Sequence, residues 1–139
     1  MANYYEILTT LTNEFTGLGM VNSVTNGSID KYTTLKKHMY PAVHIIVNNW
    51  NVDGHTKIYN ISVICMSIVE NDYSNEDDVI NQCMVITDRF FEKGRRGDLD
   101  FDIESETMQG ELFVDRFEDN VAGVTVTFDV VTPNLTTIC

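Results

Sequence analysis

The sequence has few of the residues that build metal centres and disulfide frameworks. Its 139 residues include three cysteines and three histidines, and these have no metal-ligand spacing with one another. Cys65 and Cys83 fall in apolar stretches, so we expect them to be buried, reduced thiols in a reducing intracellular environment. His44 alternates with apolar residues, a pattern more typical of a hydrogen-bonded core histidine than of a catalytic base.

Motifs for enzymatic chemistry and membrane insertion are also missing. No phosphate-binding loop, nucleophile elbow or dinucleotide fingerprint occurs. No apolar run approaches about 18 residues, and the first residues have no positively charged region typical of a secretory signal. We therefore expect a protein that is not an enzyme, that needs no metal or cofactor, and that has no membrane partner.

Positive charge is scarce, above all in the second half of the chain. Nine Lys and Arg residues stand against 21 Asp and Glu residues, giving a net charge of −12. Residues 1–70 hold four basic and five acidic residues, whereas residues 71–139 hold five basic and 16 acidic residues. This balance argues against a nucleic-acid reader, which needs a basic footprint. A surface that confers solubility is the more common meaning of such an excess.

Two segments have the spacing of amphipathic helices. The first is residues 4–15, with a capping-box-like pair at its start and Gly17 and Gly19 at its end. The second follows an N-terminal signature of Ser74 and Asp77, and we expect Gly94 to end it. The apolar stripes that define the two helices are Tyr4, Ile7, Leu8, Leu11 and Phe15 in the first, and Val79, Cys83, Ile86 and Phe90 in the second.

A β-hairpin is predicted in the middle of the chain. Residues 40–49 and 58–69 are rich in β-branched residues, and residues 50–55 between them form a loop with an Asp53-Gly54 turn signal. Both strands are apolar on both faces, which normally means that both faces are covered. Helices of the same chain can cover one face, and another subunit can cover the second. On that second face the candidate subunit-contact residues are Ile64, Met66 and Ile68.

Two more strands close the chain, at residues 107–117 and 123–132. The last strand alternates cleanly between apolar and polar residues, and a turn over residues 118–120 precedes it. Residues 133–139 form a tail that is either loose or docked on a neighbour. With a short extended piece after the first helix, the fold class is α+β. We expect a mixed or antiparallel sheet of four to five strands with two helices packed on one face.

Two charged segments are candidates for contact surfaces. The loop at residues 30–39 carries Lys31, Lys36 and Lys37, and long loops often bind partners. Acidic residues take alternate positions in the extended segment that follows the second helix. A calcium-binding loop is excluded there because its required glycine and glutamate are missing. A solvated acidic edge is favoured over a nonspecific divalent site. The acidic residues are Asp98, Asp100, Asp102, Glu104 and Glu106.

Several stretches of the sequence together carry a resemblance to a known family. They are residues 4–15, 21–27, 40–48, 59–69 with 71–72, and 115–134. They resemble the tail-terminator and neck proteins, or head-to-tail completion proteins, of tailed bacteriophages, and most closely the short virion proteins of crAss-like phages. The resemblance spans most of the chain and implies one tail-terminator-like domain over residues 1–139. The family has no catalytic residues to carry over.

What the resemblance implies is a ring. Such proteins assemble in the host cytoplasm as closed homo-oligomers, commonly six- or twelve-fold, and become part of the virion neck or tail. Their partners are other neck, tail and portal proteins, and DNA passes through the ring without specific binding. On this hypothesis the lysine loop and the second hairpin face make subunit contacts, and the acidic segment from Asp98 to Glu106 lines the channel.

A different class of protein also fits the composition. A small acidic binding protein can mimic nucleic acid and occupy the site of a DNA-binding partner. Such a protein would act as a monomer or dimer. The oligomeric state therefore discriminates between the two hypotheses.

Overall fold

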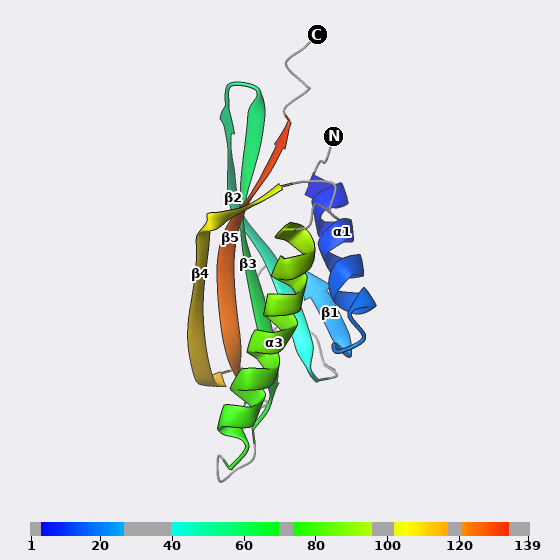
Figure 1. Cartoon of the computed structure of the whole chain (residues 1–139), viewed down its shortest axis with the longest axis vertical. Helices are drawn as coiled ribbons and strands as arrows, with labels where there is room; N and C mark the ends of the chain where they lie inside the picture. Colours follow the sequence, from blue (N-terminus) through cyan, green and yellow to red (C-terminus); the bar gives the residue numbers. More distant parts are fainter. Residues whose placement is uncertain (1–3, 27–39, 70–73, 96–101, 117–120, 134–139) are drawn as a thin grey trace.

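A computed structural model describes residues 4–26, 40–69, 74–95, 102–116 and 121–133, and all structural statements below concern these residues. They form a five-stranded mixed sheet with two helices on one face, as the sequence predicted (Figure 1). The elements in chain order are α1 (Tyr4–Gly17), β1 (Ser23–Asn26), β2 (Ala42–Asp53), β3 (Thr56–Ile68), α3 (Glu76–Arg95), β4 (Asp102–Arg116) and β5 (Val121–Pro133).

The strand order in the sheet is β1-β2-β3-β5-β4. Only β1 runs parallel to its neighbour, pairing Ser23 with Ala42 and Asn26 with Ile45. The other pairs are antiparallel. The strands β2, β3 and β5 form the centre of the sheet, between β1 and β4. Neither of the two helices described is long and apolar enough to cross a membrane.

Both helices pack their predicted stripes against the sheet, with one correction: Tyr4, which the sequence analysis placed in the stripe of α1, is 43% exposed. α1 lies over β1 and β2, and α3 lies over β3, β5 and β4. α1 ends at Gly17, and Gly19 follows with a φ of 72°, which a residue with a side chain rarely adopts. An ion pair of 2.6 Å between Lys93 Nζ and Glu14 Oε2 joins the two helices.

The observed ends of α3 differ from the predicted ones by one or two residues. The helix begins at Glu76, and the carbonyl of Asn75 accepts a hydrogen bond from the Val79 amide at 2.9 Å. The helix also continues through Gly94 to Arg95. Glycine weakens a helix without being forced to end it, so a single glycine marks a helix end only approximately.

The hairpin is longer than the sequence predicted. Residues 50–53 were expected to be loop, but they belong to β2, and the turn is only Gly54 and His55. Asp53 pairs with Thr56, and Gly54 takes a φ of 61°, as a two-residue hairpin turn requires. The turn end of the hairpin projects beyond both helices (Figure 1). We call residues 50–57 the arm.

β4 is also longer than predicted, because the acidic segment joins it. Asp102, Ile103 and Glu104 already pair with β5, and the register is irregular between Glu104 and Gln109. Among the described strands, β4 lies at the edge of the sheet opposite β1.

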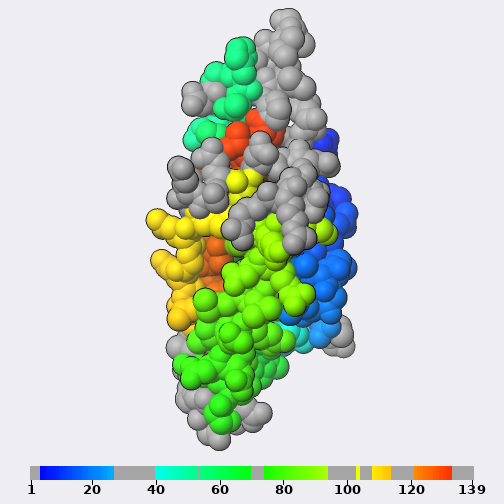
Figure 2. Space-filling model, viewed as in Figure 1, coloured from blue at the N-terminus to red at the C-terminus, as the bar shows by residue number. Residues whose placement is uncertain are grey.

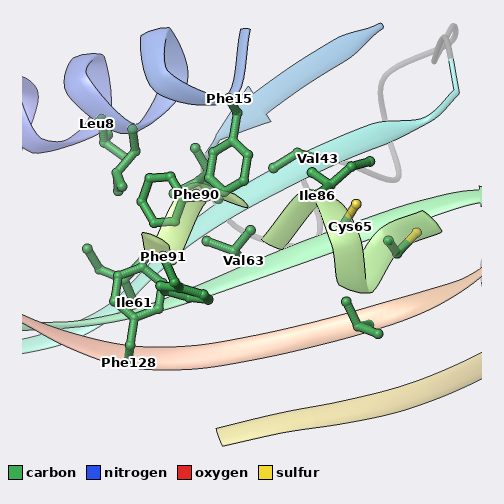
Figure 3. Packing of buried hydrophobic residues seen from close by; sticks show 14 of the residues in the cluster. Leu8, Phe15, Val43, Ile61, Val63, Cys65, Ile86, Phe90, Phe91 and Phe128 are labelled. Atoms are coloured by element: carbon green, nitrogen blue, oxygen red, sulfur yellow. The ribbon is translucent and has the colours of Figure 1, made fainter. Parts of the chain in front are cut away.

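The main core lies between the helices and the sheet. Its centre is a group of aromatic rings in which Phe90 of α3 stacks on Phe15 of α1 at 4.5 Å between ring centroids (Figure 3). Phe91 and Phe128 extend this group onto β5 at 5.1 Å from each other. Because rings from both helices and the sheet meet here, this contact holds the two layers together.

Candidate subunit-contact surfaces

The sheet face opposite the helices is polar at its centre. The sequence analysis expected the two hairpin strands to be apolar on this face as well, and for their centre that prediction was wrong. The amide Nδ2 of Asn48 donates to Asn60 Oδ1 at 2.9 Å and to Ser62 Oγ at 2.8 Å. Asn60 Nδ2 donates to Asp129 Oδ1 at 2.9 Å, and the Ser62 and Thr127 hydroxyls lie 3.1 Å apart. These bonds connect β2, β3 and β5 in a continuous polar ladder that needs no second subunit to cover it.

One end of this face remains apolar, but most of it is already buried inside the chain. Ala42, Ile64, Met66 and Val121 form a second, smaller core there. Of the three predicted contact residues, Ile64 and Met66 are therefore buried, and Ile68 is 50% exposed. Of the three predicted contact residues, only Ile68 offers substantial exposed area to a partner.

His44 is a core histidine, as the sequence predicted. Its side chain is fully buried, and Nδ1 lies 2.6 Å from the Thr25 hydroxyl on the neighbouring parallel strand. This contact attaches the short strand β1 to β2.

The charged candidates fall mostly outside the described residues. Lys31, Lys36 and Lys37 lie there, as do Asp98 and Asp100. Asp102, Glu104 and Glu106 lie in β4, which is at the edge of the described sheet. Within the described part of the chain, no group of histidine, cysteine and carboxylate side chains is arranged to hold a metal ion.

The arm carries a surface that the sequence analysis missed. Trp50 lies opposite Tyr59 in the register, and Val52 lies opposite Lys57, so the four share the helix side of the sheet. Trp50 is 59% exposed and Val52 is 47% exposed. The Lys57 ammonium lies 5.1 Å from the Trp50 ring centroid and 5.7 Å from that of Tyr59, within cation–π range. The arm therefore presents an apolar surface with one positive charge.

A second apolar surface is a groove of about 390 Å³ between α3 and β4. In Figure 2 its floor shows as a strip of β5 (orange) between α3 (green) and β4 (yellow). Exposed Met84 and Leu112 stand on its two sides. The side chains of its floor, contributed by α3, β4 and β5, are Phe91, Met108, Val124 and Val126.

The rim of this groove carries one acidic side chain, the exposed Asp88 of α3, and none of the described basic side chains lines it. Glu111 of β4 also borders the groove, but it pairs with Thr125 and its side chain therefore lies on the opposite face of the sheet. We call the groove with Asp88 on its rim the α3–β4 groove. The sequence contained one signal for the arm, the single tryptophan of the chain. It contained none for the groove, which depends on the pairing of β4 with β5.

The two described cysteines are buried and reduced, as predicted. A hydrogen bond with Cys83, together with burial, raises the pKa of the Cys65 thiol above its ordinary value of 9.0. The thiolate is the reactive form of cysteine, so this site is chemically quiet.

We predict that a Cys139→Ser chain does not react with a thiol reagent at pH 8 while folded, and that both remaining thiols react in denaturant. The pKa of Cys65 is higher in the folded than in the unfolded state, so the neutral thiol contributes to the free energy of unfolding. This contribution is complete below about pH 8.5 and declines at higher pH, where the thiol of the unfolded chain ionises. In a Cys65→Ala variant, this part of the loss of stability at alkaline pH is absent. Rapid reaction of one thiol in the folded protein contradicts the prediction.

Comparison of the sequence with protein-family models gives no match, and comparison with curated proteins gives none.

Proposed function

We propose that this protein is a structural virion protein that forms a closed ring in the neck or tail of a tailed phage. The ring joins the capsid portal to the tail around the DNA channel. The proposal combines the phage neck-protein resemblance with one structural observation. The chain has two unlike apolar surfaces at different places, the arm and the α3–β4 groove.

Two unlike surfaces are what a ring requires. A two-fold dimer uses one self-complementary patch on both subunits, whereas a ring uses two different patches that meet head to tail. The described residues include seven exposed large apolar side chains, and four of them belong to the arm and the groove: Trp50, Val52, Met84 and Leu112. Because most of the exposed apolar side chains gather at two places, they favour association through these two surfaces over apolar residues scattered singly on the surface.

The acidic charge fits a channel through which DNA moves. A carboxylate-rich lumen repels phosphate groups, so DNA passes without binding. We assign this role to the segment with Asp98, Asp100, Asp102, Glu104 and Glu106, whose last three residues lie in the edge strand β4. A virion structure with these residues on the outer rim, away from DNA, contradicts the assignment.

Native mass spectrometry and negative-stain imaging of the purified chain test the ring. We expect closed oligomers, six- or twelve-fold, whose population rises with concentration. Trp50→Asp in the arm is expected to reduce that population while leaving circular dichroism unchanged, because Trp50 is 59% exposed. Ile64→Asp is unsuitable because it would bury a charge. A chain that stays monomeric at all concentrations overturns the proposal. If that monomer also inhibits a DNA-binding enzyme, the result supports a nucleic-acid mimic instead.

A further inference from the structure

We propose that the arm of one subunit docks in the α3–β4 groove of the next copy of this chain. Trp50 and Val52 enter the apolar groove, and Lys57 faces the carboxylate of Asp88. This inference rests on the proposed ring and names the contact that closes it.

The two surfaces cannot meet within one chain. The arm lies at the turn end of the hairpin, where Lys57 pairs with Thr132. The groove floor lies farther along the same strands, where Val126 pairs with Val63 and Val124 with Cys65. At about 3.3 Å per residue, six to eight residues of β3 separate the two sites by roughly 20–26 Å. Each exposed surface therefore needs a partner from outside its own chain.

The charges identify the partner as a second copy. Lys57 is the only lysine or arginine between residues 38 and 88, and it lies over the aromatic rings of the arm. The groove offers the opposite arrangement, an apolar floor with Asp88 on its rim. A single cation within an apolar patch thus matches an apolar groove with one carboxylate on its rim. Complementary charges of this kind set the orientation of a contact and exclude the reverse one.

Geometry also favours a head-to-tail contact. The arm projects beyond the helices, so it can reach a neighbour without moving the body of its own subunit (Figure 1). The groove opens at the side of the molecule, between α3 and the edge strand β4 (Figure 2). Every subunit then contributes one arm and receives one arm, which leaves no unfilled groove in a closed ring.

Charge reversal on each side of the contact tests this inference. The arm variant is Lys57→Glu, and the rim variant is Asp88→Lys. Alone, each is expected to lower the fraction of chains in rings by at least about tenfold, because like charges then meet at the interface. Mixed in equal amounts, they are expected to restore rings in which the two variants alternate. Native mass spectrometry reads this directly, since the two subunits differ in mass.

A control separates local pairing from net charge. Asp77→Lys changes the charge equally at an exposed position in the first turn of α3, outside the groove. Mixed with the arm variant, this control is expected to restore nothing. Circular dichroism must show that every variant is folded.

The outcomes distinguish this contact from the ring itself. Wild-type rings that persist in the arm variant overturn the arm–groove contact and leave the ring intact. A wild-type chain that never associates overturns both. If the two mixed variants form only a dimer of one copy of each, the arm–groove contact is supported and the closed ring is overturned.

Discussion

Replacing Gly123 by alanine is expected to cost about 3 kcal/mol or more of folding free energy, enough to unfold a large fraction of a marginally stable domain. Gly123 lies in β5, between Met66 of β3 and Phe113 of β4 in the register. A Cβ placed there would overlap the carbonyl oxygen of Cys65 and lie 2.9 Å from the Met66 Cα atom. Both are backbone atoms in a central strand, so neither can swing away. The sheet would have to shift β3 against β5 to make room.

Gly110 supplies the matched control. It lies in β4, and a Cβ there meets only the Val126 Cγ2 atom at 3.9 Å and the Thr125 carbonyl oxygen at 4.0 Å, which is ordinary contact. Gly110→Ala is therefore expected to change stability by no more than about 0.5–1 kcal/mol. Urea denaturation followed by circular dichroism measures both variants. Equal stabilities for the two variants would show that β3 and β5 do not approach as closely as described.

Much of the fold follows from the spacing of apolar residues. The stripe of α1 and the alternation in β5 both predict their element and its buried side, because helices and strands have different periods. The Asp53-Gly54 signal also marks the correct turn, since a positive φ is needed there. These features depend on neighbours in the sequence, which is why the sequence alone contains them.

The arm and the long β4 could not be predicted in this way. Asn51 and Asp53 have low strand propensity, which favours a loop at that position. They are in β2 because β3 continues beside them and is itself held by β5 as far as Thr56 and Pro133. Pairing between segments more than 70 residues apart in the chain thus overrides the local preference.

The same limit applies to the candidate contact surfaces. Alternation correctly places Ile64 and Met66 on the face away from the helices, but it cannot show that Val121 of β5 packs beside them. Nor does it show that Asn60 has Asp129 as a hydrogen-bond partner. Local pattern therefore identifies which face a residue occupies, whereas tertiary pairing decides whether that face is left for a partner.

The second large effect is expected at Phe90, where α1, α3 and β5 meet. Its ring is fully buried, stacks on Phe15 with an interplanar angle of 15°, and lies 5.2 Å from Phe91 and 6.2 Å from Phe128. Phe90→Ala removes the central ring of this group, and the surrounding rings come from three different elements that cannot all move inward. We expect a loss of about 3–5 kcal/mol, the usual range for a buried phenylalanine truncated to alanine.

Tyr5→Ala tests whether the loss comes from burial and not from deletion of an aromatic ring as such. Tyr5 lies on α1, is 77% exposed and makes an edge contact only with the neighbouring Tyr4 among the described rings. Its removal is expected to change stability by less than about 0.5 kcal/mol. Urea midpoints measured at one protein concentration compare the two variants, and the concentration must be low enough to keep both monomeric. A Phe90→Ala chain as stable as Tyr5→Ala would mean that the helices do not share a core with β5, and the layered arrangement in Figure 3 would be wrong.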